Sequence, residues 1–268
     1  MSSAISRIRS YLADHPWLDL VHYYDTVDST NTLAKSLASD GAPSGTVLIA
    51  DRQLAGRGRM GRRFSSPGGM GVYFSVILRP GCPPTSLMHL TCAAAVTACD
   101  AVERAFGFRP RIKWTNDLVF GNRKLAGILT ELSLDPKTGA VDYAVIGVGI
   151  NCCQTPEDFE PSIQSIACSA RMVTGAPVER ERLCAELIRS FSRLDQTLLT
   201  EKDAVMQRYR RDCITIGQSI SILQGTQVRH ARATGITGDG ALLVTYDDGS
   251  TGEVTSGEVS IRGMYGYV

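Results

Sequence analysis

The sequence predicts an α+β fold, in which a domain with a mixed β-sheet is followed by a small all-β barrel. Two observations indicate this architecture. Apolar segments typical of buried strands alternate with segments of helical periodicity as far as about residue 211. After Cys213, short alternating strands are separated by glycine turns. The composition, with 43% hydrophobic and 21% charged residues, is typical of a globular protein.

The first elements can be placed from their residue patterns. Residues 21–26 read as a strand, and the cap-type residues at positions 28–30 follow it. A helix is expected over 31–40, where leucines and alanines recur at helical spacing. The apolar runs 46–51 and 72–79 are expected to form the next two strands.

The middle of the chain contains two longer helical patterns with strands between them. Residues 86–106 predict a long helix with one apolar face, and 179–211 predict a second helical region with a break near Thr200. Further strands are expected over 110–114, 118–120, 124–132 and 141–150. The turn residues Gly121 and Asn122 indicate a hairpin between two of these strands.

The change of pattern near 212–216 predicts a domain boundary. We expect a larger domain over 1–212 and a small SH3-like barrel over 213–268. Glycine turns should divide the strands of the barrel, at Gly225, Gly235, Gly238, Gly240 and Gly249.

Charge and cysteine usage narrow the class of protein. The net charge of +1 implies no overall attraction to nucleic acid or to an acidic membrane. No apolar run is expected to reach the roughly 20 residues that span a bilayer, and the N-terminus lacks the hydrophobic core of a secretory signal. The eight cysteines lie in apolar contexts without a C-x-x-C pattern. We therefore expect a reduced, cytoplasmic protein without disulfides or structural zinc. The vicinal pair Cys152 and Cys153 favours plain packing, and a redox-active pair is the alternative.

The segment 53–63 (QLAGRGRMGRR) is the most informative part of the sequence. Its glycines fit the letters G-x-G-x-x-G of a dinucleotide site, but the residues after it (FSSPGG) cannot begin the helix that such a site needs. Five arginines fall between positions 52 and 63 with no acid among them. Arginine binds phosphate and carboxylate, and the glycines keep the chain flexible. The pattern favours a loop that orders over an anionic ligand; the alternative is a solvated basic loop that contacts nucleic acid.

Four other segments place polar residues beside strands. Residues 28–31 (DSTN) could cap a helix or bind a polar ring such as a cyclic urea, and 113–117 (KWTND) could form a turn or hold a magnesium phosphate group. Lys124 begins an apolar strand, in which Gly127 suggests a close approach to the backbone. Residues 147–151 (GVGIN) end another strand in the same manner, or simply close it in a turn.

The order of these segments resembles that of the biotin protein ligases. The resemblance runs from about residue 20 to 265 and rests on D-S-T-N, Q-x-A-G-R-G-R-x-G-R, S-P-x-G, K-W-x-N-D, K-L-A-G-I-L, G-V-G-I-N and a terminal S-G-E-V-S. It implies a biotin/lipoate ligase-like catalytic domain that joins biotin and ATP, with Mg²⁺, into biotinyl-5′-adenylate. Biotin then passes to one lysine of the biotin carboxyl carrier domain of a biotin-dependent carboxylase.

The resemblance also implies roles for individual residues. Those expected to contact biotin are Ser29, Thr30, Asn31, Gln53, Gly56, Arg57, Gly58, Arg59, Lys124 and Gly127. Those expected on the ATP side are Arg57, Arg59, Arg62, Phe64, Lys113, Asn116, Lys124 and Asn151. Lys124, Arg59 and Asp117 are the expected catalytic residues, and Asp117 is also the candidate metal ligand.

Two departures from the family pattern matter for these expectations. Thr115 stands where the family usually has proline, which restricts the backbone but carries no chemistry, so little functional loss is expected. Only about 20 residues precede the first family strand, too few for the winged helix-turn-helix of many bacterial members. We therefore expect no DNA partner. No apolar strip decides between a monomer and a homodimer.

Two alternative functions remain at this point. Lipoate-protein ligases share the catalytic fold, and Arg62, Arg63 and Ser65 match part of their R-R-x-S-G-G-G segment, although Pro67 interrupts the glycines. The second alternative is a non-enzymatic nucleic-acid-binding module. It is weakened because the segment 213–268 has little basic excess and only scattered aromatic residues.

Overall fold

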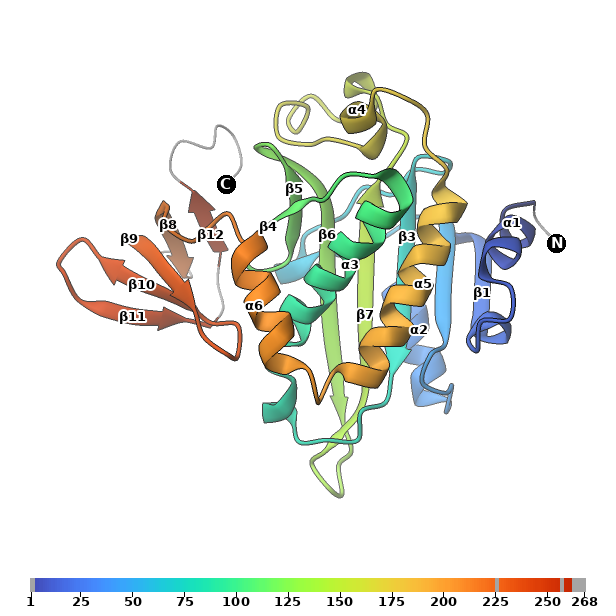
Figure 1. Ribbon diagram of the computed structural model, residues 1–268, viewed down its shortest axis with the longest axis horizontal. Coiled ribbons are helices and arrows are strands. Elements are labelled where there is room, and N and C mark those ends of the chain that lie inside the picture. Colours follow the sequence, from blue (N-terminus) through green and yellow to red (C-terminus); the bar gives the residue numbers. More distant parts are fainter. Residues whose placement is uncertain (1–2, 225–226, 256–257, 262–268) are drawn as a thin grey trace.

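The larger domain is a seven-stranded mixed sheet with helices on both faces (Figure 1). The structure is a computed structural model that describes residues 3–224, 227–255 and 258–261. The strand order is β1-β2-β3-β7-β6-β5-β4, and β1–β2 is the parallel pair whereas the other neighbours are antiparallel. The strands are β1 (Val21–Val27), β2 (Val47–Gln53), β3 (Gly71–Leu78), β4 (Arg111–Lys113), β5 (Asp117–Phe120), β6 (Arg123–Leu134) and β7 (Val141–Asn151). The predicted mixed sheet is confirmed.

Successive side chains of β3 point to opposite faces of the sheet and divide the core in two. Phe74 and Val76 join the large apolar cluster beneath the long helices, whereas Ile77 joins a smaller cluster beneath α2. The helices are α1 (Ser3–Leu12), α2 (Thr30–Ser39), α3 (Leu90–Phe106), α4 (Ala170–Thr174), α5 (Arg180–Thr197) and α6 (Lys202–Asp212). Figure 1 shows α3, α5 and α6 in front of the sheet, with α2 behind it.

The long helices differ slightly from their predicted extents. The predicted helix 86–106 begins at Leu90, because Pro84–Leu87 forms a separate 3-10 turn. The region 179–211 is interrupted after Thr197 and resumes at Lys202, which confirms the break near Thr200. Two helices were not predicted. α1 buries Ile5, Ile8 and Leu12 at helical spacing, a signal present in the sequence, whereas the five residues of α4 are too few to show a period.

The expectation that no apolar run is long enough to cross a bilayer was wrong, because the stretch Pro84–Phe106 has both the length and the apolar composition to do so. However, 72% of the most apolar part of this stretch is buried inside the protein, where α3 packs against α5 and α6. The small alanine and cysteine side chains of α3 allow this close packing, so the apolar residues serve the core.

The C-terminal segment forms a five-stranded antiparallel sheet in the order β11-β10-β9-β8-β12. Its strands are β8 (Ser219–Gln224), β9 (Gln227–Ile236), β10 (Leu242–Tyr246), β11 (Thr251–Val254) and β12 (Glu258–Ile261). The larger domain holds this sheet through buried hydrogen bonds, including one from Trp114 Nε1 to the carbonyl of Gly240 at 2.9 Å. The prediction of a small all-β unit after the helices is confirmed. Gly225, Ser256 and Gly257, parts of the predicted turns and terminal motif, lie outside the described residues.

All eight cysteines are free, as predicted, and each except Cys153 is buried. Burial raises the pKa of Cys92 to about 12, and raises that of Cys152 well above its ordinary value. These thiols are therefore protonated at neutral pH and behave as apolar packing groups. Nowhere in the described ranges do three His, Cys, Asp or Glu side chains gather as a metal site.

Phe191 of α5 holds the helix layer to the centre of the sheet. Its side chain is fully buried and stacks on Phe74 of β3, with ring centroids 5.5 Å apart. Phe191→Ala should lower the free energy of unfolding by about 3–5 kcal/mol, because it leaves a cavity where the rings pack. Urea titration followed by circular dichroism measures the change. Leu199→Ala, at a side chain that is 50% exposed, serves as the control and should change stability by less than about 0.5 kcal/mol. Equal effects of both substitutions would contradict the assigned packing.

Candidate active site

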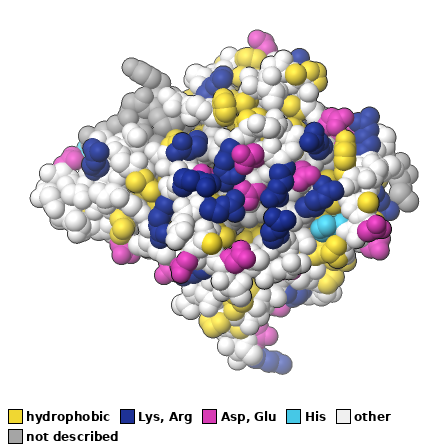
Figure 2. Space-filling view, in the orientation of Figure 1, with side chains coloured by type: hydrophobic (Ala, Val, Ile, Leu, Met, Phe, Trp, Pro, Cys, Tyr) yellow, Lys and Arg dark blue, Asp and Glu magenta, His cyan; other side chains and the backbone are white. Residues whose placement is uncertain are grey.

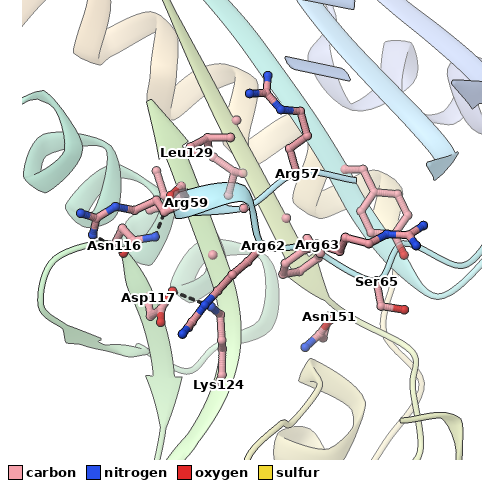
Figure 3. Close-up of a pocket in the computed structure, with 18 of the residues that line it drawn as sticks. Arg57, Arg59, Arg62, Arg63, Ser65, Asn116, Asp117, Lys124, Leu129 and Asn151 are labelled. Atoms are coloured by element: carbon pink, nitrogen blue, oxygen red, sulfur yellow. Dashed lines mark hydrogen bonds and ion pairs between the residues drawn. The ribbon is translucent and has the colours of Figure 1, made fainter. Parts of the chain in front are cut away.

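One pocket of about 360 Å³ collects almost all of the predicted site residues (Figure 3). It lies over the sheet and is bounded by the beginning of α2, the loop that follows β2, and residues of β6 and β7. The predicted residues that line it are Ser29, Thr30, Asn31, Gln53, Arg57, Gly58, Arg59, Arg62, Phe64, Lys113, Asn116, Asp117, Lys124, Gly127 and Asn151. Gly56 is the predicted residue that does not line it. Positions up to 122 residues apart in the sequence therefore meet at one site.

The first part of the pocket is a hydrogen-bonded polar group at the N-terminus of α2. The oxygen Oε1 of Gln53 accepts hydrogen bonds from the backbone nitrogen and hydroxyl of Thr30, at 2.9 and 3.1 Å. The Ser75 hydroxyl lies 2.8 Å from Thr30 Oγ1 and 2.7 Å from Asn31 Oδ1, so its single proton can be donated to either oxygen. Ser29 caps the helix, as its position predicted. This network fixes hydroxyls and amides at a helix N-terminus, which suits a small polar ring.

Asn31 has a larger structural role than predicted. Its amide nitrogen donates to the carbonyl of Leu129 at 3.2 Å and to the Glu131 carboxylate at 3.0 Å. A side chain added at Gly147 would come within 2.0 Å of Asn31 Oδ1. Glycine is needed at position 147 because the Asn31 side-chain amide lies against the backbone there. The alternative interpretation, a strand that simply closes in a turn, does not explain this glycine.

The glycine-arginine segment forms a hairpin of its own, without the helix of a dinucleotide site. The backbone nitrogen of Gly58 donates to the carbonyl of Arg62 at 2.7 Å, and that of Phe64 donates to Gly56 at 3.0 Å. Met60 and Gly61 turn the chain with positive φ angles of 54° and 74°. Gly56 is required by packing, because a side chain there would meet the Phe64 carbonyl at 2.4 Å. Its predicted contact with biotin stays a prediction.

Two polar contacts hold the arginine loop to the sheet. Arg59 Nη1 donates to Asn116 Oδ1 at 3.1 Å, and the Asn116 amide in turn donates to the carbonyl of Ile128 at 2.8 Å. Arg57 Nη1 forms an ion pair with Glu131 of β6 at 3.1 Å. In Figure 3, Arg59, Asn116, Asp117 and Lys124 lie on one side of the loop, whereas Arg57 extends to the other. The loop is thus fixed at both flanks.

Glu131 was not predicted as a site residue, although it lies in the same strand as Lys124. Burial alone would raise its pKa. Hydrogen bonds from Lys35 and Asn31, and the charge of Arg57, outweigh burial and hold the pKa of Glu131 below its ordinary value. The carboxylate is therefore ionised at neutral pH, and it can bind Arg57 with full charge.

The centre of the pocket is cationic. Lys124 Nζ lies 2.6 Å from Asp117 Oδ1, and Lys113, which pairs with Asp117 in the β4–β5 register, is buried. A side chain added at Gly127 would lie 3.5 Å from Lys124 Cε and Nζ, an ordinary contact within the protein, so the predicted close approach to this glycine stays a prediction about a ligand. Tight approaches occur instead at Gly147 and at Gly149, where a side chain would lie 2.7 Å from the Phe64 ring.

Another part of the pocket wall combines aromatic rings with amides. The rings of Phe64 and Tyr73 meet edge to face with centroids 6.5 Å apart, and Asn151 lies at the end of β7. The segment that follows β7 also lines the pocket but was not predicted. It contributes Gln154, Asp158, Phe159, Glu160, Ile163, Ile166 and Ala167. The chain returns to the sheet where Ala167 forms a parallel β-bridge with Lys124. No local sequence pattern predicts this contact.

The helix-covered face carries arginines of a different kind. Figure 2 shows lysine and arginine side chains there interspersed with acidic ones. Arg109 contacts Asp100, Glu103 and Asp212, and Arg208 also contacts Asp100. Charges paired in this manner form a surface network, and not the continuous basic stripe of a nucleic-acid interface.

Comparisons with known proteins agree with the predicted resemblance. The sequence model of the Biotin/lipoate A/B protein ligase family matches residues 23–151, and that of the Biotin protein ligase C terminal domain matches 215–262. The Bifunctional ligase/repressor BirA of Bacillus subtilis (strain 168) is 33% identical over 85% of this chain and 70% of its own length. The Biotin--[acetyl-CoA-carboxylase] ligase of Mycobacterium tuberculosis is 32% identical over 86% of this chain and 85% of its own.

A solved structure agrees over nearly the whole fold. The biotin protein ligase from Aquifex aeolicus in complex with biotin and ATP matches with a TM-score of 0.74 and 28% identity. The match covers 90% of this chain and 98% of that one. The similarity therefore extends over both the mixed sheet and the C-terminal strands.

Glu131→Gln should loosen the arginine loop, because the amide keeps the shape of the side chain but removes the charge that holds Arg57. Trypsin cuts after arginine, so cleavage between Arg57 and Arg63 should be up to about fivefold faster, as expected for a partly exposed ion pair. Asp142→Asn removes the partner of Arg79, an ion pair of similar exposure outside the pocket, and should leave this cleavage unchanged. An unchanged rate in the Glu131 variant would show that the ion pair does not order the loop.

Proposed function

This chain belongs to the biotin protein ligases, and from that premise we propose how its pocket activates biotin with ATP and which residues take part. The function is to join biotin to a protein. The observation that carries the proposal is that a polar group, a cationic centre and aromatic rings line one pocket. Biotin, phosphates and adenine need these three environments.

Biotin binds with its ureido ring at the polar group around Thr30 and Gln53. The ring presents both donors and an acceptor, and the hydrogen bonds among these side chains hold them in place before the ligand arrives. Its carboxylate then points toward Lys124 and the arginine loop. Phe64 supplies an aromatic wall for adenine at the opposite end, and Asn151 lies beside it.

The first half-reaction brings two anions together. A carboxylate oxygen of biotin attacks the α-phosphorus of ATP, the bond from that phosphorus to the β-phosphate oxygen breaks, and pyrophosphate leaves. Lys124, Arg57, Arg59 and Arg62 offset the repulsion and stabilise the charge that spreads over the phosphate in the transition state. Lys113 adds a buried positive charge at the base of the site.

Magnesium fits this pocket as a companion of the ATP phosphates. The described residues offer no group of three acids that could hold an ion unaided. Mg²⁺ commonly takes one or two carboxylates and completes its shell with phosphate oxygens and water. Asp117 is the proposed carboxylate, and Asn116 is the proposed neighbouring oxygen donor. When bound, the ion neutralises phosphate charge.

The arginine loop protects the product of this step. A mixed anhydride hydrolyses readily, so water has to be kept away from it. The hairpin over residues 56–64, held by Asn116 and Glu131, covers the cationic centre of the pocket. Closing of this loop retains the adenylate until the acceptor arrives.

In the second half-reaction, the neutral amine of an acceptor lysine attacks the biotinyl carbonyl. The bond from that carbonyl to the adenylate oxygen breaks, and AMP leaves. Asp117, Asp158 and Glu160 are acids in the pocket wall. We propose that Asp117, the metal candidate of the first half-reaction, accepts the amine proton in the second, and the cost of protonating a carboxylate beside Lys124 is set against its place in the pocket. The proposed partner is the biotin carboxyl carrier domain of a biotin-dependent carboxylase.

The lipoate alternative is not supported, because the relatives that match most of the chain are biotin ligases. We propose a catalytic domain over residues 1–212 and a C-terminal domain over 213–268. The cytoplasmic location and the choice between monomer and homodimer stay predictions.

The transfer reaction tests the function directly. The purified chain, biotin, ATP and Mg²⁺ are incubated with an unmodified biotin carrier domain, and the intact mass of the carrier is measured. A mass increase of one biotinyl group, absent when the acceptor lysine is replaced by arginine, is the expected result. No mass increase with any supplied carrier, together with no adenylate formed, would refute the proposal.

Arg59→Ala should weaken retention of the adenylate more than initial binding of ATP. The substitution removes a charged donor of the loop and its contact with Asn116, so release of preformed adenylate should accelerate by about 10- to 100-fold. Rapid filtration of the labelled adenylate complex measures the rate. Arg52→Ala, which changes an exposed arginine outside the pocket, is the control. Unchanged release from the Arg59 variant would remove this arginine from the proposed lid.

Lys124→Ala should reduce adenylate formation by about 100- to 1,000-fold and leave the fold intact. The strand is held by backbone hydrogen bonds, from Lys124 to Ile166 and from Cys168 to Lys124, that do not depend on the side chain. Circular dichroism and adenylate formation are measured together, with the exposed Lys137→Ala as control. Wild-type turnover in the Lys124 variant would exclude this residue from the mechanism.

A further inference from the structure

The segment 113–117 carries site residues of the larger domain, but a later part of the chain holds it in place. The backbone nitrogen of Trp114 is buried and donates to the hydroxyl of Thr215 at 2.9 Å. The indole nitrogen of the same residue donates to the carbonyl of Gly240 at 2.9 Å. Both acceptors belong to the proposed C-terminal domain, whereas Trp114 lines the pocket. The two domains therefore meet at the centre of this segment.

The hydroxyl of Thr215 has a fixed place beside β4. Thr215 is fully buried, and the residue before it, Ile214, donates from its backbone nitrogen to the carbonyl of Ile112 at 2.8 Å. Cys213 forms a parallel β-bridge with the same residue of β4. Without the threonine oxygen, the Trp114 nitrogen would lose its acceptor in the interior, which is costly. The hydroxyl thus holds the backbone where β4 ends.

The other end of the segment is tied to β6 and to the arginine loop. Asn116 accepts at its backbone carbonyl from the nitrogen of Ile128 at 3.0 Å, and its side-chain amide donates back to the Ile128 carbonyl at 2.8 Å. Its Oδ1 accepts from Arg59 at 3.1 Å. A single residue separates Asn116 from Trp114, so a backbone shift at Trp114 displaces the amide that holds the loop.

A second contact from the later chain supports the same short stretch. The hydroxyl of Tyr209, a fully buried side chain of α6, donates to the carbonyl of Thr115 at 3.0 Å. The backbone between Trp114 and Asn116 is therefore held by α6 as well as by the C-terminal domain. Small displacements of groups that orient a substrate have large effects on rate. A side chain that never touches the substrate can consequently affect the reaction through this backbone.

We propose that Thr215 is a positioning residue for adenylation. By holding the backbone of Trp114, it sets Asn116 and Asp117 at the place where the phosphates bind. It also sets the Asn116 amide against Arg59. The inference rests on the proposed function for the roles of Asn116 and Asp117 toward ATP. The support given to Arg59 does not depend on that function, so it can be tested without substrates.

Three variants separate the hydroxyl of Thr215 from the packing around it. Thr215→Val keeps the shape of the side chain and removes the acceptor, whereas Thr215→Ser keeps the hydroxyl. Thr46→Val is the matched control, because Thr46 is also buried and donates to the Pro43 carbonyl at 2.8 Å outside the pocket. Urea titration measures the stability of each variant, and all rates are expressed per folded molecule.

The first measurement is ATP–pyrophosphate exchange at varied biotin concentration. Thr215→Val should lower kcat by about 10- to 100-fold, as expected when a group that orients site residues is lost. The KM for biotin should stay within about twofold, because the polar group at α2 keeps its own hydrogen bonds. Thr215→Ser should restore kcat to within about threefold of wild type. Thr46→Val should leave kcat unchanged. Equal losses in Thr215→Val and Thr215→Ser would overturn the inference, because the hydroxyl would then not be the cause.

The second measurement is trypsin cleavage between Arg57 and Arg63 without biotin or ATP. Thr215→Val should accelerate this cleavage by about two- to fivefold, because Asn116 no longer holds Arg59 in place. Thr215→Ser and Thr46→Val should be cleaved at the wild-type rate. Unchanged cleavage in Thr215→Val would overturn the inference. Faster cleavage in a chain that forms no adenylate would support the inference and count against the proposed function alone.

Discussion

The concentration of positive charge at one end of the sheet is the constraint on which the rest of the site depends. Arg57, Arg59 and Arg62 share a loop without acids, and Lys113 and Lys124 lie beneath it. Such charges repel one another unless acids or ligands compensate them. Glu131 and Asp117 supply part of the compensation from adjacent strands. The positive charge that these acids leave uncompensated suits the carboxylate and phosphates that adenylation brings together. The same charges therefore hold the loop in place and stabilise the reacting anions.

The sheet register makes this arrangement possible. Gly127 of β6 faces Gly149 of β7, and Leu129 faces Gly147, so the two strands present a surface with few side chains. Asn31 and the Phe64 ring occupy the space left at Gly147 and Gly149. The polar group, the arginine loop and the aromatic end are therefore joined by contacts with the same two strands. This common support explains how segments from α2, the loop after β2 and the end of β7 form one continuous pocket.

Much of the fold and of the site could be predicted because the signals are local. Period-two and helical patterns placed the strands and long helices, and almost all of the residues predicted from the motifs line one pocket. Contacts between distant segments carried no such signal. Arg57 contacts Glu131, which lies 74 positions further along the sequence. The need for glycine at position 147 can be seen only when α2 places Asn31 against it. The segment after β7 has no periodicity, so Gln154 and Phe159 were missed. Gly56 shows the converse, a motif residue whose role is to fold the loop.

The most direct test of the central claim is ATP–pyrophosphate exchange by the purified chain without any carrier protein, with biotin in one reaction and lipoate in another. The proposed site predicts exchange that requires biotin and Mg²⁺ and is absent with lipoate. Exchange with lipoate alone would keep the fold and the charge argument but contradict the assignment of the polar group at α2. No exchange with either acid would contradict the claim that the arginine loop and Lys124 activate a carboxylate.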